Sequence, residues 1–393
     1  MPFAVAMMLT FQRDGFLLIA GMYFPFDYLF NLYIVAVAFF LLTPHFTLNG
    51  NEPLMRRYIP LILFIIWILI RGIVLGNEMY APNHTKLLSC LAGIILGVHT
   101  MRWDLPLLRR SLVILNLIFI LLIIIFIPST LLGIGGNNNL GISARLGEDI
   151  SGGILVVFPR TAYTLVIACF ACFMIEKNIY FRLLSFVSML FPLILGFSTG
   201  GRGGLFGFAV AIVIVFFGIQ IVSGNKKKFL SVSLQVLLMG LTYGAYIIAV
   251  NYFPLLADRV NSGDDSGRYL IWEDMLKNIS LFGSGPIEIY AHNLFIEAIH
   301  DYGIIGFILL LILLFSTLSQ LWAAWRYRAD MELVWLSAII ALQLVSQQFS
   351  LDLFWGYFWT AIVLPLSLNI SPNSTEAFYV LPKDNDSLFL IKC

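Results

Sequence analysis

Residues 251–292 form a polar segment whose side chains could act on a sugar hydroxyl and on phosphate oxygens. The segment contains Arg259, Arg268 and Trp272 and closes with His292, and long apolar runs flank it on both sides. Loops held by a rigid scaffold are where catalytic and binding residues concentrate. We therefore interpret this segment as the place where the chain does chemistry at a membrane surface.

His292 stands at the entry of the next apolar run, downstream of the arginine-bearing segment. A neutral imidazole near pH 7 can accept a proton from a sugar hydroxyl, so His292 is the candidate base. Asn293, the next residue, could hydrogen-bond the sugar or fix the imidazole ring. The alternative for a lone histidine is a structural role, and its position along the chain is what favours catalysis.

Arginines on the predicted outer face form the second candidate group. The fork of an arginine side chain binds phosphate oxygens in pairs, which the point charge of a lysine cannot do. Any one of them could instead be snorkelling to the headgroups or pairing with an acid. Because several converge on one side, we expect them to bind an anionic ligand. They are Arg145, Arg160, Arg202, Arg259 and Arg268.

Arg202 lies in a glycine cluster, Ser198 to Gly204, between two apolar runs. Glycines let backbone N–H groups approach and surround an anion. The helix predicted to start here adds the positive end of its dipole. The other interpretation is a tight helix–helix turn that needs glycine for steric reasons and leaves Arg202 at the headgroups.

Arg268 begins a short amphipathic segment that ends at Ile279. Helical spacing of its apolar residues predicts a helix whose one apolar face lies on the bundle or in the membrane interface. Asp265 or Ser266 is the predicted N-cap. Arg268 would then stand in the first turn, where an anion is favoured, or in an ordinary solvated turn. The apolar residues are Ile271, Trp272, Met275, Leu276 and Ile279.

The composition indicates which class of protein must position these residues. Sixty per cent of the residues are hydrophobic and 11% are charged, and the mean hydropathy is +0.92, which lies far outside soluble usage. Since the alternation typical of a β-barrel is absent, we predict an all-α polytopic membrane protein. Eleven or twelve helices that cross the membrane are expected near 16–42 (one long or two short), 58–76, 86–100, 107–128, 160–176, 180–198, 203–223, 229–250, 299–324, 332–349 and 353–370.

Basic residues fall at every second connection, and short basic loops stay cytoplasmic. The connections between them must face outward, which places the C-terminal tail inside. The first helix is expected to stay, because no secretory cleavage signal precedes it. The predicted organisation is a transmembrane bundle over 1–250, an outward catalytic loop over 251–298, C-terminal membrane helices over 299–370 and a cytoplasmic tail over 371–393. The basic connections carry Arg56-Arg57, Arg102 with Arg109-Arg110, Lys177 with Arg182, Lys226 to Lys228, and Arg326 with Arg328.

The sequence gives little support for metal, redox, nucleotide or nucleic-acid chemistry. Cys169 and Cys172 have the spacing of a zinc or redox motif, but they lie in an apolar run without a second pair, so neither role is expected. Asp264 and Asp265 could bind a divalent ion, although a solvated acidic turn is the better interpretation. Nucleotide-binding and zinc-protease motifs are absent. A net charge of +1 gives no argument for nucleic acid. We expect no metal, no cofactor and no nucleic-acid partner.

Four motifs follow one another along the second half of the chain. They are Ser198-Thr-Gly-Gly-Arg-Gly-Gly204, Ser266-Gly-Arg-(x)3-Trp272, Gly283-Ser-Gly-Pro286 and His292-Asn-Leu-Phe-Ile-Glu-Ala-Ile-His-Asp-Tyr-Gly-Ile-Ile-Gly306. Each motif is weak without the others, but their order resembles the O-antigen polymerase and O-antigen ligase family of bacterial polysaccharide assembly. The resemblance covers roughly residues 190–310.

The resemblance implies a metal-independent glycosyltransferase with a glycosyltransferase-C-like fold, in the bacterial inner membrane with its active site facing the periplasm. The donor would be an undecaprenyl-pyrophosphate-linked glycan, and membrane lipids and a chain-length regulator protein would be further partners. By motif position, Arg202 and Arg268 would hold the pyrophosphate and His292 would be the important histidine, while Arg160 matches less closely. The outer loop is shorter than in many relatives, which leaves acceptor recognition open.

Three functions compete. Polymerisation of lipid-linked repeat units comes first, because the outer loops are short. Ligation of the glycan to the lipid A core uses the same fold and chemistry. A transporter or flippase would carry ionisable groups at the bilayer midplane and internal repeats. Arg71 is the one such charge in an otherwise apolar run, and no repeat is visible.

Overall fold

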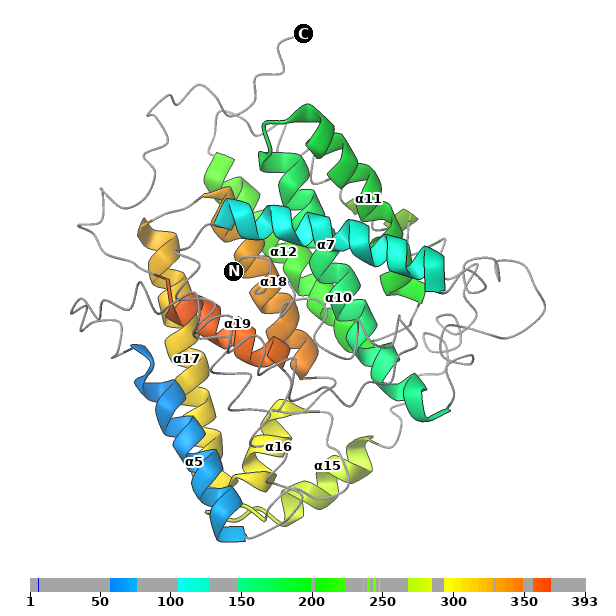
Figure 1. Cartoon of the computed structure of the whole chain (residues 1–393). Helices are drawn as coiled ribbons and strands as arrows, with labels where there is room; N and C mark the ends of the chain where they lie inside the picture. Colours follow the sequence, from blue (N-terminus) through cyan, green and yellow to red (C-terminus); the bar gives the residue numbers. More distant parts are fainter. Residues whose placement is uncertain are drawn as a thin grey trace, which may run out of the picture.

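The computed structural model describes residues 57–75, 105–126, 148–198, 202–223, 268–284, 293–327, 330–348 and 356–368, with residue 6 and a few positions between 236 and 247. Every regular element in these ranges is an α-helix (Figure 1). The helices are α5 (Ile59–Leu75), α7 (Leu105–Phe126), α10 (Glu148–Ile175), α11 (Ile179–Ser198), α12 (Arg202–Ser223), α15 (Arg268–Lys277), α16 (Leu294–Asp301), α17 (Gly303–Tyr327), α18 (Met331–Gln347) and α19 (Gly356–Leu366).

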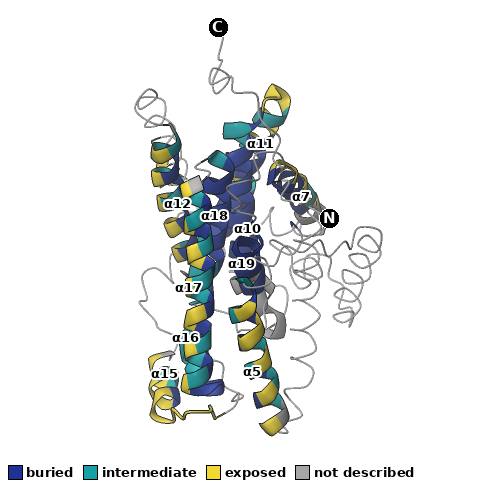
Figure 2. Ribbon diagram, turned by 90° about the vertical axis from the view of Figure 1, so that its left-hand side faces the viewer, coloured by how far each residue is buried: buried dark blue, intermediate teal, exposed yellow. Residues whose placement is uncertain are grey.

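The described helices form an α-helical membrane protein. Three of them contain stretches long and apolar enough to cross a bilayer: Ile179–Phe197, Gly203–Val222 and Gly303–Arg326. Large apolar side chains are exposed along the outer faces of α5, α12 and α17, while the interior holds α10 and α18 (Figure 2). Such a surface is matched to lipid, which solvates apolar side chains as well as a protein core does.

The helix boundaries follow the apolar runs. The spans predicted over 58–76, 107–128, 180–198, 203–223 and 332–349 correspond to α5, α7, α11, α12 and α18 with small shifts at their ends. The helix predicted over 353–370 is shorter and covers Gly356–Leu366. Predicted spans at 16–42 and 86–100, and most of 229–250, lie outside the described residues, so the total number of spans stays a prediction.

α10 is longer than predicted. It begins at Glu148, whereas the sequence predicted an outward connection up to residue 159 and a span from 160. Pro159 therefore lies inside the helix and not at its first turn. Proline is tolerated within membrane helices because neighbouring helices and local adjustments satisfy the freed backbone groups. Arg160 consequently lies within a continuous helix rather than at a helix start.

The span predicted over 299–324 is also divided. The chain bends at Tyr302, so that α16 ends at Asp301 and α17 begins at Gly303. Gly303 has a φ of +73°, in the left-handed region that glycine enters without steric cost. The bend separates the short α16, which carries His300 and Asp301, from the long apolar α17.

α18 forms the centre of the bundle and is buried along most of its length. It packs against α12 through two glycines, which let the backbones approach closely, as small residues do between membrane helices. A Cβ on Gly207 would lie 2.6 Å from the carbonyl oxygen of Leu342, and a Cβ on Gly218 would lie 2.7 Å from Val334 Cγ1. The two contacts run in opposite order along the helices, so α12 and α18 are antiparallel.

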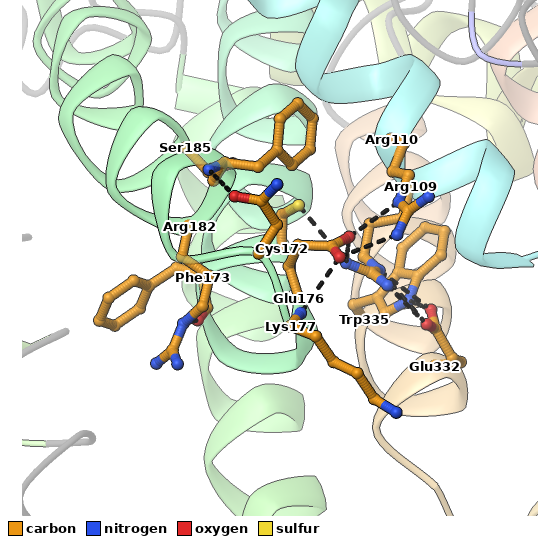
Figure 3. A network of polar contacts seen from close by, with 12 residues as sticks. Arg109, Arg110, Cys172, Phe173, Glu176, Lys177, Arg182, Ser185, Glu332 and Trp335 are labelled. Atoms are coloured by element: carbon orange, nitrogen blue, oxygen red, sulfur yellow. Dashed lines mark hydrogen bonds and ion pairs between the residues drawn. The ribbon is translucent and has the colours of Figure 1, made fainter. Parts of the chain in front are cut away.

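A network of buried charges ties the start of α7 to the end of α10 and the start of α18 (Figure 3). The guanidinium of Arg109 lies 3.0 Å from Glu332 Oε1 and 3.7 Å from Glu176 Oε2. Arg110 donates two hydrogen bonds of 2.8 Å to Glu176, and these bonds lower the pKa of the Glu176 carboxyl. Trp335 donates to the second oxygen of Glu332. The network pairs each buried carboxylate with a cation, which buried charges require.

The Arg109 network lies where α7 and α18 begin and where α10 ends. Near the end of α5, Arg71 donates to the carbonyl of Gly283 at 2.7 Å. Which side faces the cell interior stays a prediction.

Candidate functional site

Arg160 is the first predicted site residue whose side chain the structure describes. It is fully buried on α10, and its Nη1 donates a 2.9 Å hydrogen bond to Oε1 of Gln347 at the end of α18. One turn further along both helices, Gln343 Nε2 donates to Thr164 Oγ1 at 2.8 Å. The two bonds form successive rungs between antiparallel helices, so the polar side chains of α10 and α18 lie in one continuous strip.

The start of α12 packs directly beside Arg160. A Cβ on Gly204 would lie 2.7 Å from Pro159 Cβ and 3.5 Å from the backbone nitrogen of Arg160. Because α12 begins at Arg202, two of the predicted arginines come together at one place in the backbone. Gly204 therefore has the steric role that the alternative interpretation of the glycine cluster required, and this role brings the helix start close to the backbone of the buried Arg160.

This arrangement is suited to an anion. The first turn of a helix presents backbone N–H groups without intrahelical partners, and its dipole favours negative charge. The start of α12 brings this property close to the backbone of Arg160. The side chain of Arg202 lies outside the described part of the chain, as does all of Arg259. For the described atoms, the backbone at Arg160 and the helix start at Arg202 are adjacent.

Two glycines close the base of the loop that contains His292. Gly283 and Gly303 both have positive φ, +87° and +73°. A Cβ on Gly283 would lie 2.6 Å from the backbone nitrogen of Gly303. Ser284 N donates to the carbonyl of His300 at 2.8 Å, and Ile304 N donates to the carbonyl of Ser280 at 3.2 Å. We call the contact between Gly283 and Gly303, with these flanking hydrogen bonds, the glycine clasp.

α5 supports the glycine clasp with two side-chain hydrogen bonds. Arg71 Nη2 donates to the carbonyl of Gly283 at 2.7 Å, and Trp67 Nε1 donates to the carbonyl of Tyr302 at 2.9 Å. Arg71 is buried. The sequence singled it out as a charge within an apolar run, the pattern of a transporter; its described partner is a backbone carbonyl of the loop. Arg71 and Trp67 are thus positioning residues that sequence reasoning did not recognise.

Asn293 caps α16. Its Oδ1 accepts hydrogen bonds from the backbone nitrogens of Phe295 at 3.0 Å and Ile296 at 3.2 Å. The side-chain oxygen of Asn293, which we expected to bind the sugar or the imidazole of His292, is therefore used by the cap. His292 precedes the cap and lies outside the described residues, so its predicted role stays a prediction.

α16 carries a buried histidine–aspartate pair. His300 Nδ1 lies 2.8 Å from Asp301 Oδ1, and both side chains are almost completely buried. Burial raises the pKa of Asp301, because the carboxylate loses water, and the contact with His300 opposes that shift. Sequence reasoning concentrated on His292 and missed this pair. The signal in the sequence was a pair of ionisable residues within an apolar stretch, where such residues are rare and commonly functional.

α15 begins at Arg268, as predicted, and ends at Lys277, two residues before the predicted end. Met275 is buried against the protein, and Leu276 is exposed. The position of the apolar face, on the bundle or in the membrane interface, stays a prediction. Trp272 is half-buried and makes an edge-on ring contact with Tyr269, their centroids 5.4 Å apart. The predicted caps Asp265 and Ser266 and the side chain of Arg268 lie outside the described part.

Cys169 and Cys172 are buried free thiols in α10. Asn116 Nδ2 donates to Cys169 Sγ at 3.2 Å, and Arg109 Nη1 to Cys172 Sγ at 3.4 Å, so both sulfurs contribute to helix packing. Among the described residues, no three metal-ligating side chains come together. Asp264 and Asp265 fall outside those residues.

Comparisons with known proteins add no relative: no protein-family model, no curated protein and no solved structure matches this chain.

Proposed function

We propose that this protein is a membrane glycosyltransferase that polymerises undecaprenyl-pyrophosphate-linked oligosaccharide repeat units at the outer face of the bacterial inner membrane. The donor is one lipid-linked glycan, and the acceptor is the non-reducing end of another. The acceptor hydroxyl attacks the anomeric carbon, the bond to the lipid pyrophosphate breaks, and His292 accepts the proton of the hydroxyl. Arginines stabilise the charge that develops on the departing pyrophosphate.

The observation that carries this proposal is the position of Arg160. Arg160 is fully buried, and its backbone nitrogen lies 3.5 Å from the Cβ position of Gly204 in the first turn of α12, which supports an anion site at this helix start. Preorganised charges in a site shielded from water stabilise a transition state better than mobile ones do. The bond from Arg71 to the carbonyl of Gly283 also supports the proposal, because it gives this buried arginine a role in holding the loop that contains His292.

Replacement of the arginines tests the proposal. Arg160→Ala and Arg202→Ala should each lower polymer formation by about 10²–10³-fold, the usual worth of one preorganised charge in a transition state. Lysine should restore little, since it lacks the bidentate geometry. Arg326→Ala is the matched control, because Arg326 is exposed at the far end of α17. Wild-type polysaccharide ladders from both alanine variants would contradict the anion site.

His292→Ala tests the base. The rate should fall by roughly 10²–10⁴-fold, the contribution of a positioned acid–base group. Binding of the lipid-linked donor should change little, because the arginines supply it. A normal turnover with weaker donor binding would make His292 a donor-binding residue and move the search for the base to Asp258, Glu273 and Glu288.

A metal-removal assay and a product assay complete the test. Activity of the purified protein should survive EDTA, because the arginines stabilise the leaving group without a metal. Activity lost in EDTA and restored by Mg²⁺ would assign a metal to Asp264 and Asp265. The glycan should lengthen on undecaprenyl pyrophosphate; transfer to the lipid A core would instead identify a ligase.

A further inference from the structure

We infer that α15 is an interfacial helix, which inserts one side of its surface into the lipid at the end of the bundle where α17 begins. The inserted side consists of Tyr269, Trp272 and Leu276, which we call the α15 stripe, and the segment 278–282 extends it. The partner is the bilayer surface, which binds these side chains because they are apolar or aromatic. The inference goes beyond the proposed function, since it holds whatever reaction the protein catalyses.

The α15 stripe is a second apolar side of the helix. Tyr269, Trp272 and Leu276 follow one another at spacings of three and four residues, which places them on one side of a helix. Tyr269 is 67% exposed, Leu276 is exposed and Trp272 is half-buried. Met275, on the adjoining side, is buried against the protein. α15 therefore packs on the protein through one side and leaves the two outer residues of the stripe exposed.

The segment after α15 adds two more exposed apolar side chains. Leu281 and Phe282 are 51% and 53% exposed. Their backbone is held by the first turn of α17, where Ile304 N donates to the carbonyl of Ser280 at 3.2 Å and Ile305 N donates to the carbonyl of Leu281 at 3.3 Å. Because the backbone is fixed in this way, Leu281 and Phe282 stay at the surface.

The same hydrogen bonds fix the level of the segment in the membrane. The apolar stretch Gly303–Arg326 contains 24 residues, and at about 1.5 Å per residue it is about 36 Å long, whereas the hydrocarbon core measures about 30 Å. The first turn of α17 therefore lies at the edge of the hydrocarbon, and the segment 278–282 lies beside it. Tyrosine and tryptophan are enriched at this level of membrane proteins.

The exposed apolar surface continues from the membrane helices to α15. Phe282 lies against Trp67 of α5, with ring centroids 6.2 Å apart. Ile70 and Val74 are exposed on α5, and Ile304 is exposed on α17. Figure 1 shows α15 crossing the direction of α5 and α17 at this end of the bundle, and Figure 2 shows exposed residues on all three helices. Lipid covers α5 and α17, so a bilayer is the partner that fits the whole surface.

Charge does not draw α15 to the membrane. The two cations of α15, Arg268 and Lys277, are matched in number by its two anions, Glu273 and Asp274, so their formal charges cancel. Lys277 Nζ lies 2.9 Å from Glu273 Oε1, and both side chains are well exposed. Interfacial helices bind through buried apolar area and through attraction to anionic lipids. For α15 only the apolar term remains, so anionic lipids are not required.

Spin-label accessibility in lipid nanodiscs tests the inference. The full-length protein carries Cys90→Ser and Cys393→Ser, and Cys169 and Cys172 stay in place because they are buried. Single cysteines are then introduced and labelled with a nitroxide, with the parent protein as the background. Collisions of each label with oxygen, which concentrates in lipid, are compared with collisions with a water-soluble nickel chelate. Thermal unfolding of each variant is measured beside the parent.

Labels on the inserted surface should collide more with oxygen than with the nickel chelate. They are placed by Tyr269→Cys, Leu276→Cys and Phe282→Cys, so the loss of one variant through misfolding leaves two others. Leu270→Cys is the matched control, because Leu270 is apolar and 73% exposed, but helical spacing places it on the opposite side of α15, beside Asp274. Leu270→Cys and Asp274→Cys should show the reversed preference. Nanodiscs of neutral and of anionic lipid should give the same pattern.

Three other patterns overturn the inference. If the nickel chelate reaches every label, α15 lies in water. If the labels at Tyr269 and Leu276 are shielded from both reagents, protein covers the α15 stripe, either another segment of this chain or a second copy. If the label at Leu270 also collides mainly with oxygen, the helix is immersed on all sides and has no distinct lipid-facing stripe. None of these patterns bears on the proposed reaction, which the arginine and histidine variants test separately.

Discussion

Gly283 and Gly303 face each other so closely that a Cβ on Gly283 would lie 2.6 Å from the backbone nitrogen of Gly303. The contact joins the two ends of the segment 284–302, which contains His292 and α16. Arg71 and Trp67 of α5 hold the carbonyls of Gly283 and Tyr302. The shape of the loop therefore depends on backbone contacts at its base, and α5, more than 200 residues earlier in the chain, contributes to them.

The first prediction concerns this glycine clasp. Gly303→Ala should lower the free energy of unfolding by about 1–3 kcal/mol for the strained backbone alone, and should lower activity as well. The added methyl group also meets backbone atoms of Phe282 at 2.5 Å, which cannot move aside as a side chain would. Thermal unfolding and polymer formation measure the two effects. Gly244→Ala is the control, since nothing lies within 4 Å of its Cβ position. Equal stability of both variants would show that the clasp is dispensable.

The second prediction concerns the packing of α12 on α18. Gly207→Ala should destabilise the protein by about 1–3 kcal/mol, the usual cost of overpacking, because the methyl group meets the carbonyl oxygen of Leu342 at 2.6 Å. Gly240→Ala places its methyl group in open space and should change little. Thermal unfolding in detergent compares the two. If Gly207→Ala unfolds at the wild-type temperature, the close approach of the two helices is not required.

The third prediction concerns the buried charge network. Arg109→Leu leaves Glu332 without its 3.0 Å ion pair, and should destabilise the protein by about 3–5 kcal/mol, as removal of one partner of a buried pair does. Arg326→Leu, at an exposed position, should change the unfolding free energy by less than about 1 kcal/mol. Chemical unfolding of both variants tests the difference, and an Arg109 variant as stable as the control would show that the network adds nothing to stability.

The fourth prediction concerns pH. Burial raises the pKa of Asp301, so the folded protein binds that proton more tightly than the unfolded chain does. The resulting stability is fully present below the ordinary aspartate pKa of about 3.9 and is lost as the pH rises through the raised value. Asp301→Asn cannot titrate, so the stability of the wild type relative to this variant should increase as the medium is acidified.

Unfolding temperatures of both proteins between about pH 4 and pH 8 test that trend across the aspartate pKa. The same pair of measurements in a His300→Gln background separates the carboxyl from its histidine partner, which lies 2.8 Å away. A difference that shrinks or stays constant on acidification would contradict a raised pKa for Asp301.

The sequence by itself determined which segments of the described chain are helical and roughly where most of them end. A backbone in lipid must satisfy its hydrogen bonds internally, so long apolar runs such as Ile179–Phe197 and Gly203–Val222 have little alternative to a helix. Local signals also placed the start of α15 at Arg268 and the start of α12 at Arg202. These predictions succeeded because the information lies within one turn or one apolar run.

Only the tertiary structure decided which polar side chains meet. Gln347 lies 187 positions from Arg160, and Arg71 lies 212 positions from Gly283. Neither partner is marked by local spacing, because the register between two helices is set by contacts such as Gly207 against Leu342. A fully apolar run has no period that shows which face packs inward. The sequence therefore predicted the helices and the candidate arginines, and helix packing determined which residues hold them.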